Sequence, residues 1–323
     1  MALKSVEIRV AGKNTLVPAA EVCGRTIIVR GGRVKEATEL DADLAPGEFV
    51  SDPEKFVKEL KRSGLKADLL TFFQRPPDVT PKFKCHLDWD NYAVVDCSNF
   101  DAWWEKLPQE ARKNTRRSAK RGVTVKVAVF DDELARGIHK LCNESPMRQG
   151  KPFWHYGKDF ETVKREHATF LERSDFVGAY FEGELIGFIK MVYVDGLAYI
   201  LHIIAFNSHY DKRPLNALIT ESVKICSQKG VKYFVYGQYI YGNKKDSTLV
   251  EFKRRNGFEQ LNFPRYYVPL TLKGKIFVSL RLYRGLVGLL PAPVLSVLLK
   301  LREKIYALKT KPEKTEPAKD KEE

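Results

Sequence analysis

Residues 251–258 read Glu-Phe-Lys-Arg-Arg-Asn-Gly-Phe, and they lie near the end of the most informative segment of the chain, 123–268. Apolar periodicity and turn residues predict, in order, a strand, two helices, three strands, a helix, a strand, a helix and a strand. Thr248 and Glu251 have the spacing of a capping box, and we expect the last of these helices to begin there.

The boundaries of these elements follow from Gly, Pro and Asp signals in the sequence. The expected strands are 123–129, 176–181, 185–194, 197–206 and 233–236. The expected helices are 132–142, 160–173, 214–228 and one that begins at Thr248.

This order of elements resembles the GNAT acyltransferase fold, and the Phe252-Lys253 pair resembles the Fem peptidoglycan-bridge aminoacyltransferases, which share that fold. The resemblance implies an α/β protein with a mixed central sheet and flanking helices. It also implies an enzyme, an N-acyltransferase that moves an acyl group from an activated donor to an amine. Acyl-CoA is the default donor of the superfamily. Two alternatives stay open: a Fem-like, aminoacyl-tRNA-dependent transferase on a cell-envelope precursor, and a catalytically degenerate binding protein at an anionic surface.

Composition adds constraints on partners and compartment. The net charge of +14 over 323 residues favours an anionic partner, such as a phosphorylated donor, tRNA or an acidic membrane surface; DNA is not among the partners we expect. Five scattered cysteines without a C-x-x-C pair indicate reduced thiols, with neither a disulfide framework nor a metal site. We expect no tightly bound cofactor. No secretory signal is evident, which predicts a cytoplasmic protein or one peripheral to the inner face of the membrane.

The chain divides into four predicted parts: a small α/β unit (1–108), the GNAT/Fem-like domain (109–271), an amphipathic helical tail (272–308) and a disordered charged tail (309–323). In the first part, short strands at 6–10, 26–30, 69–73 and 92–95 surround a helix that Ser51-Asp-Pro-Glu54 opens. The apolar stretch 276–308 has two interpretations. It lies on an anionic membrane as an interfacial hairpin, or it packs back on the catalytic unit.

A cationic helix is predicted over 109–121. Helical spacing places Arg112, Arg116 and Lys120 on one face. Such a face could hold the phosphates of a nucleotide-linked or tRNA donor. The alternative is a solvated helix whose cations complement its own C-terminal dipole.

The donor site is expected around the turn at 207–217, because GNAT enzymes grip the acyl-CoA pyrophosphate with glycine amides at the matching turn. Here Arg213 and Leu215 replace the glycines, and Pro214 removes one amide. Lys212 and Arg213 either hold an anion by their side chains or are exposed turn cations. The resemblance implies these donor-binding residues: Ile204, Ala205, Phe206, Lys212, Arg213, Asn216 and Phe252.

Lys253 is the principal catalytic candidate. In Fem enzymes the lysine of the Phe-Lys pair is implicated in stabilising the transition state, so a cation here is expected to offset a developing oxyanion. The alternative is an exposed lysine beside Arg254 and Arg255. Tyr239 is a candidate proton donor. The alternative is a packing residue whose hydroxyl contacts solvent.

The loop 146–156 is the expected border of the acceptor groove, since it is rich in aromatic and cationic residues. Arg148, Trp154 and Tyr156 are its candidate acceptor-binding residues. His155 could act as a base near neutral pH, although a histidine in an aromatic loop is more often structural.

Overall fold

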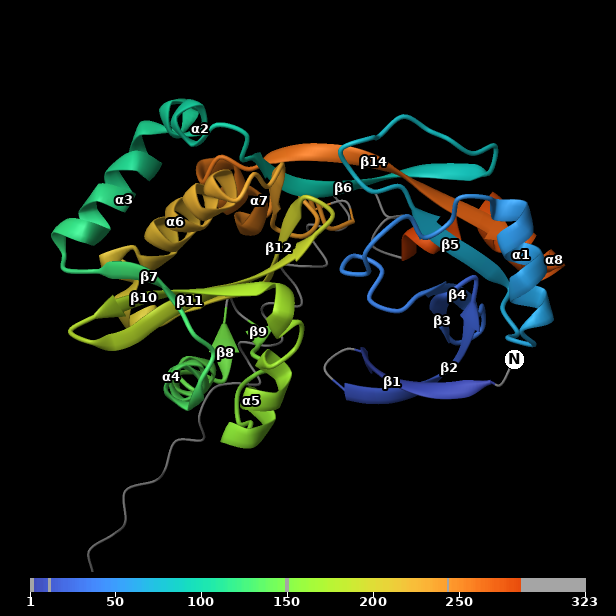
Figure 1. Ribbon diagram of the computed structural model, residues 1–323, viewed down its shortest axis with the longest axis horizontal. Helices are drawn as coiled ribbons and strands as arrows, with labels where there is room; N and C mark the ends of the chain where they lie inside the picture. Colours follow the sequence, from blue (N-terminus) through green and yellow to red (C-terminus); the bar gives the residue numbers. More distant parts are fainter. Residues whose placement is uncertain (1–2, 11–12, 149–150, 243, 286–323) are drawn as a thin grey trace, which may run out of the picture.

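The computed structural model describes residues 3–10, 13–148, 151–242 and 244–285, and Figure 1 shows their arrangement. The strands are β1 (Lys4–Val10), β2 (Lys13–Val22), β3 (Arg25–Arg30), β4 (Glu36–Glu39), β5 (Leu69–Phe73), β6 (His86–Asp96), β7 (Thr124–Ala128), β8 (Met147–Arg148), β9 (Lys151–Pro152), β10 (Ser174–Phe181), β11 (Glu184–Val194), β12 (Leu197–Ala205), β13 (Tyr233–Val235) and β14 (Glu259–Pro269). The α-helices are α1 (Pro53–Arg62), α2 (Phe100–Lys106), α3 (Gln109–Lys120), α4 (Asp132–Cys142), α5 (Phe160–His167), α6 (Pro214–Gln228), α7 (Thr248–Arg255) and α8 (Leu272–Ser279).

One mixed sheet runs through the whole described chain. Its strand order is β1-β2-β3-β4-β5-β14-β6-β13-β12-β11-β10-β7, and only β8 and β9 stand apart as a small hairpin. The β4–β5 and β12–β13 pairs are parallel and the others are antiparallel. The mixed sheet with flanking helices is therefore as predicted.

Helices cover both faces of the sheet in its C-terminal half, as Figure 1 shows for α6 and α4 on opposite sides of β11. Ile189 and Met191 of β11 pack in the cluster that contains α6, whereas Leu185 and Phe188 pack in the cluster that contains α4. A strand that is buried on both faces has no polar side, which explains why β11 is apolar almost throughout.

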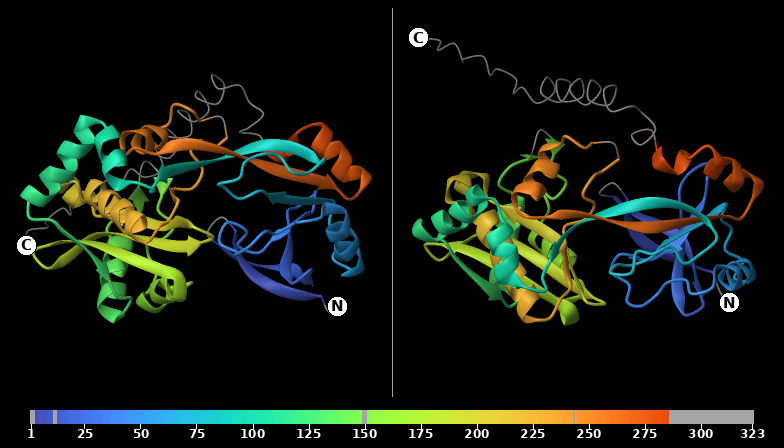
Figure 2. Two further views of the ribbon diagram at one scale, coloured as in Figure 1. Left: turned by 45° about the horizontal axis from the view of Figure 1, so that its top comes forward. Right: turned by 90° about the horizontal axis from the view of Figure 1, so that it is seen from above.

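Two long strands, β6 and β14, each pair with strands from the other half of the sequence. β6 comes from the N-terminal part of the sequence, yet it pairs with β13 and β14; β14 comes from the end of the described chain and pairs with β5. Figures 1 and 2 show these two strands running side by side across the middle of the molecule. The division at residue 108 stays a prediction, but the sheet itself is continuous across it.

Several element boundaries differ from the predicted ones for local reasons. Asp52, not Ser51, caps α1, because its carboxylate accepts the amides of residues 54 and 55. Ser247, not Thr248, caps α7, since its hydroxyl accepts the Val250 amide three residues on. The predicted helix 160–173 ends at residue 167, and a short 3₁₀ turn over Leu171–Arg173 follows it.

The predicted C-terminal tail lies mostly outside the described residues. Its first part forms α8 and a 3₁₀ turn over Leu282–Arg284, which pack beside β14. The predictions for 286–308 and for the disordered tail at 309–323 concern residues that the structure does not describe. Among the described residues, no helix is long and apolar enough to cross a membrane.

Candidate active site between β12 and β13

β12 and β13 separate after three paired positions. Leu197–Tyr199 of β12 pair with Tyr233–Val235 of β13, and residues 200–205 have no β13 partner. The chain after β13 turns toward β6 instead: the Tyr236 amide donates to the Ala93 carbonyl, and the Ala93 amide donates to the Gly237 carbonyl. A gap therefore opens in the sheet beside residues 236–238.

Lys253 of α7 lies at this gap and is fully buried. Its Nζ donates to the Gln238 carbonyl oxygen at 2.6 Å, and the rings of Tyr236 and Tyr241 lie 4.6 and 5.1 Å from it. No carboxylate among the described residues forms an ion pair with this amine. Burial lowers its pKa from 10.5 to about 8. The interpretation of Lys253 as an exposed helix cation is therefore wrong.

Two side chains and a glycine fix the position of α7. The Asn216 amide of α6 donates to the Asn256 side-chain oxygen at 2.8 Å. Gly257 has φ of +76°, and a Cβ there would meet Leu107 and Trp103 at 2.6 and 2.7 Å. Only glycine fits such a close approach at positive φ, so the Asn-Gly pair after α7 holds Lys253 against the gap.

A cavity of about 350 Å³ lies beside Gln238. Its lining residues come from β6, β12, β14 and two loops: Asp43, Leu44, Asp90, Tyr92, Tyr199, Ile200, Leu201, Gly237, Gln238, Tyr241 and Arg265. Asp90 accepts from the Gln238 amide at 2.9 Å and from Arg265 Nε at 2.8 Å. Asp43 accepts from the Tyr92 hydroxyl at 2.5 Å. Tyr199 also lines this cavity, and its buried hydroxyl interacts with the side chains of Tyr92 and Arg75.

A second polar cavity, of about 360 Å³, shares Asp90, Gln238 and Arg265 with the first. It extends to Tyr283 and Arg284 in the turn after α8.

The predicted donor turn is arranged differently from a phosphate-binding loop. The Glu144 carboxylate accepts the amides of Asn207 and Ser208 at 2.8 and 3.0 Å, and Arg148 pairs with it at 3.1 Å. Arg213 adopts the left-handed conformation, with φ of +57°, just before α6. An internal carboxylate thus occupies backbone donors that could otherwise face a phosphate.

The other predicted donor residues fall into two places. Asn216 and Phe252 lie with the Lys253 site, Asn216 through Asn256 and Phe252 with its ring edge toward Tyr236. The remaining ones lie at or beyond the end of β12: Ile204 and Ala205 are buried, Phe206 packs between two core clusters, and Lys212 lies over the Phe181 ring.

Arg148 and His155 of the predicted acceptor loop are engaged within the protein. Arg148 donates to the carbonyls of Ala205 and Leu141 as well as to Glu144. His155 is buried against His167, and burial, with nearby cations, lowers its pKa to about 3. An imidazole with that pKa is neutral and weakly basic at pH 7, which corrects the expectation of a base near neutrality.

Three further candidates are accessible. Trp154 and Tyr156 are exposed, and Trp154 lies between the Arg9 guanidinium at 4.4 Å and the Lys158 amine at 4.2 Å. Tyr239 is partly buried against the core, which raises the pKa of its hydroxyl. No described contact joins any of the three to Lys253.

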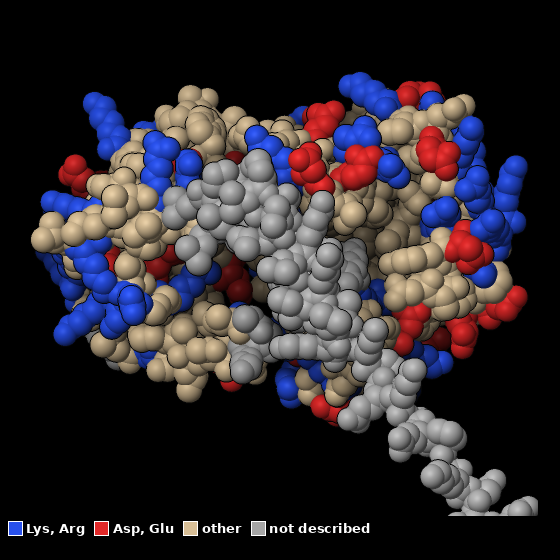
Figure 3. Space-filling model, turned by 180° about the vertical axis from the view of Figure 1, so that it is seen from behind, with Lys and Arg blue, Asp and Glu red and all other residues tan. Residues whose placement is uncertain are grey.

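Of the three cations predicted on one face of α3, only one forms an ion pair with a residue that the structure describes. Arg112 pairs with Glu105 at 2.8 Å, whereas Arg116 lies 5.8 Å from the Trp104 ring and Lys120 is exposed. Lys and Arg side chains gather along the right edge in Figure 3, the end of the molecule where α3 lies. This end therefore offers positive charge to an anionic partner.

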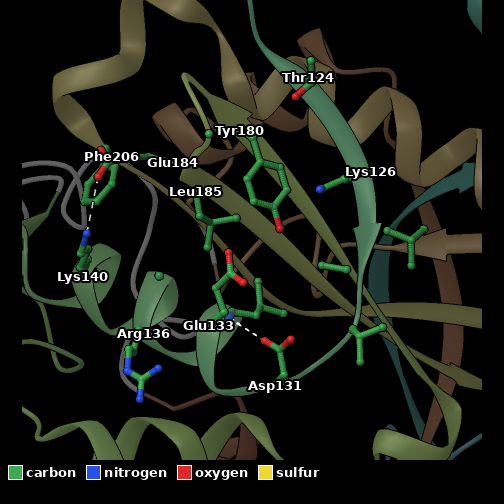
Figure 4. A pocket seen from close by; sticks show the side chains of 16 residues that line it. Thr124, Lys126, Asp131, Glu133, Arg136, Lys140, Tyr180, Glu184, Leu185 and Phe206 are labelled. Atoms are coloured by element: carbon green, nitrogen blue, oxygen red, sulfur yellow. Dashed lines mark hydrogen bonds and ion pairs between the residues drawn. The ribbon is translucent and has the colours of Figure 1, made fainter.

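A further cavity, of about 670 Å³, lies away from Lys253, between β7, α4 and the β10–β11 turn (Figure 4). Both cations and carboxylates line this cavity, and the Lys140 amine lies 3.5 Å from the Glu184 carboxylate. Of the predicted site residues, it includes only Phe206. Within the described chain, no group of three or more His, Cys, Asp or Glu side chains could hold a metal ion.

The sequence did not reveal the carboxylates near the gap. Asp43 lies in a loop before α1 and Asp90 lies within β6, so no local motif joins them to Gln238. Asp88, Asp90 and Asn91, directly before the predicted strand 92–95, were the available signal, because Asp and Asn are uncommon in strands.

Neither a protein-family model nor a curated protein matches this sequence. Solved structures do. FemX superposes with a TM-score of 0.56 at 12% identity, covering 86% of this chain and 90% of that one. The C-terminal domain of a putative lysylphosphatidylglycerol synthetase from Agrobacterium fabrum gives 0.51 at 16% identity, covering 84% and 90%. L-PGS from Bacillus licheniformis gives 0.52 at 15% identity, covering 84% and 89%. The predicted fold is confirmed as the one that FemX has, and these likenesses show the fold alone.

Proposed function

We propose that this protein transfers an acyl group from an activated donor to an amine, and that the reaction takes place at the gap between β12 and β13. The observation that carries the proposal is Lys253, a fully buried amine at the gap that has no carboxylate partner among the described residues. Burying a cation without a counter-ion costs stability, so such a group is commonly found where it has a chemical task.

The chemistry follows from that cation. The amine nitrogen of the acceptor attacks the carbonyl carbon of the donor ester or thioester, and the carbonyl oxygen gains negative charge. Lys253 is mostly protonated at neutral pH because its pKa is about 8. Its ammonium has three N–H donors, of which one goes to Gln238, and it can stabilise the oxyanion. The intermediate then collapses, the donor oxygen or sulfur leaves, and the proton lost by the amine passes to it.

The acceptor is placed in the cavity beside Gln238. The cavity holds two carboxylates, Asp43 and Asp90, and one cation, Arg265, which pairs with Asp90. The remaining negative charge attracts a protonated amine before it loses its proton and attacks. This arrangement supports an acceptor that carries an amine rather than a hydroxyl alone.

The donor turn supports an aminoacyl-tRNA donor over acyl-CoA. Glu144 occupies the Asn207 and Ser208 amides and brings negative charge to the place where a pyrophosphate would sit. The free cations of α3, by contrast, suit an extended polyanion such as tRNA. Acyl-CoA remains the second candidate, with Lys212 and Arg213 as its cations. If aminoacyl-tRNA is the donor, the proposed acceptor is a cell-envelope precursor at the cytoplasmic face of the membrane.

The test is donor binding followed by donor consumption. Thermal unfolding is measured with acetyl-CoA, with total aminoacylated tRNA and with the same tRNA deacylated, because a ligand of the folded state raises the midpoint. Labelled aminoacyl-tRNA and, in a parallel reaction, labelled acetyl-CoA are then incubated with the protein and a lysine-containing peptide as amine acceptor. We expect aminoacyl-tRNA to be bound and consumed, and Lys253→Met to bind it without consuming it. Binding of acetyl-CoA alone would move the donor to acyl-CoA. Consumption of neither donor would refute acyl transfer and favour a degenerate binding protein.

A further inference from the structure

The outward face of α8 is apolar, the reverse of what a surface helix normally presents. Leu272, Ile276 and Leu280 are 74%, 53% and 60% exposed, and they recur every four residues, which places them on one side of the helix. Leu282, in the following turn, is 40% exposed. Figure 2 shows α8 at the surface of the half of the molecule that holds α1. We call the first three residues the α8 stripe.

The opposite face of α8 is fixed to the protein, so the helix cannot rotate to hide the stripe. A Cβ on Gly274 would meet the Asp68 carbonyl oxygen at 1.9 Å, and Val278 is buried. The Thr271 hydroxyl caps the helix and donates to the Asp68 carboxylate at 2.9 Å. The stripe therefore faces solvent because of how the helix is anchored.

Cations border the stripe on both sides. At about 100° per residue, Lys273 falls next to one edge of the stripe and Lys275 next to the other. Both are exposed; Lys273 pairs with Asp68 at 3.2 Å, and Arg281 follows as an exposed cation just after the helix. Long cationic side chains beside an apolar stripe can reach the headgroups of a bilayer while the stripe enters its boundary.

We propose that α8 docks this protein on a membrane surface that contains anionic lipid. A protein partner is the less suited occupant, because a stable interface buries about 800 Å² on each side and the stripe is three side chains on a convex two-turn helix. The net charge of +14 adds attraction to an anionic surface. The chain also continues beyond residue 285 with the apolar run Leu-Val-Gly-Leu-Leu.

The position of α8 connects docking to the candidate active site. Tyr283 and Arg284, directly after the helix, line the cavity that also contains Gln238, whose carbonyl holds Lys253. An acceptor headgroup at the membrane surface would thus have a polar route toward the gap. The docking proposal does not depend on acyl transfer, since vesicle binding is measured without any donor.

The test is vesicle binding by the full chain, with phosphatidylglycerol–phosphatidylcholine vesicles and with phosphatidylcholine vesicles as the neutral comparison. The variant that carries Leu272→Ser, Ile276→Ser and Leu280→Ser is expected to lose affinity by about tenfold or more. Neutralising Lys275 and Arg281 to Gln is expected to weaken binding to the anionic vesicles by about fivefold for each cation, and to leave the neutral vesicles unaffected. The matched control replaces two equally exposed apolar residues at the two ends of the sheet, Leu16→Ser and Val129→Ser, and should bind like wild type.

A second variant separates α8 from the rest of the tail. Leu298→Ser, Leu299→Ser and Leu301→Ser change the apolar sequence outside the described residues and leave the α8 stripe intact. The proposal is supported if this variant still binds vesicles and if adding the three α8 substitutions to it removes that binding. Wild-type binding by the α8 variant would overturn it. The proposal would also be overturned if the wild type self-associated without vesicles and the α8 substitutions abolished that self-association. A second copy of the chain would then be the partner that covers the stripe.

Discussion

Replacing Lys253 by Met keeps most of the side-chain volume and removes the ammonium. A pKa of about 8 in place of 10.5 corresponds to about 3 kcal/mol by which burial of the charged amine destabilises the fold. This destabilisation is fully present below about pH 8, because the amine is then charged in both states. It disappears as the pH rises through 10.5, where both states are neutral. Wild-type stability should therefore increase between these two values, and that of Lys253→Met should not increase for this reason.

The net effect on stability at pH 7 is expected to be small. Removing the charge restores about 3 kcal/mol, whereas the Gln238 carbonyl loses its donor, which costs about 1–3 kcal/mol. The effect on turnover is expected to be large: removing one oxyanion-stabilising group typically lowers kcat by about a hundredfold or more. A folded protein without activity is thus the expected result.

Lys190 provides the matched control. It is also fully buried with a pKa of about 8, but its amine donates to the carbonyls of His167 and Thr169 and to the Thr169 hydroxyl, and none of these acceptors lies at the gap. Lys190→Met regains a similar amount, about 3 kcal/mol, but it leaves three acceptors without a donor at about 1–3 kcal/mol each, so it should lose stability yet keep the turnover of its folded fraction.

Urea unfolding at neutral and at alkaline pH measures the stability difference, and consumption of labelled aminoacyl-tRNA measures turnover. The reasoning about Lys253 fails if Lys253→Met retains turnover within about threefold of wild type, well short of the expected loss. It also fails if wild type and variant show the same dependence of stability on pH between about 8 and 10.5.

Transfer by the wild type should decline as the pH rises through about 8, because the Lys253 ammonium loses its proton there; a rate that keeps rising to about pH 10 would contradict this role. Glu144→Gln should lower the free energy of unfolding by about 1–3 kcal/mol, since it removes the charge that pairs with Arg148 in a largely buried place; urea unfolding midpoints equal to wild type would count against that pairing. Replacing Arg116 and Lys120 by Gln should reduce the salt slope of tRNA binding by about 1.4, at about 0.7 for each lost phosphate contact, whereas equal slopes in a filter-binding titration would remove α3 from the tRNA site.

The order of elements could be predicted because its signals are local. α4 and α6 match their predicted bounds, and in both cases a cap or a proline marks the first turn: Asp131 accepts the Leu134 amide, and Pro214 opens α6. The strands could be located by their apolar runs, but their partners could not. The pairing of β6 with β13 and of β14 with β5 joins segments that are far apart in the sequence, and no local pattern specifies it.

The sequence predicted Lys253 and two neighbours of its site, Asn216 and Phe252, but neither the burial of Lys253 nor the carboxylates near the gap. Lys253 was identified from the Phe-Lys pair, but its burial was not, because Arg254 and Arg255 beside it suggested a solvated face. Those two arginines pair with Glu251 on the outside of α7, and Lys253 points the other way. The His155 pKa depends on packing against His167 and on cations from other elements, which a one-dimensional sequence does not display.

The exchange of β6 and β14 has a consequence for synthesis of the chain. β5 needs β14 as its neighbour, and β14 ends at Pro269, so the N-terminal part of the sheet has an unfilled edge until most of the chain has left the ribosome. β6 likewise has no neighbours before β13 and β14 emerge. The two halves should therefore mature together, late in translation, and a nascent chain arrested before residue 259 should remain sensitive to protease throughout.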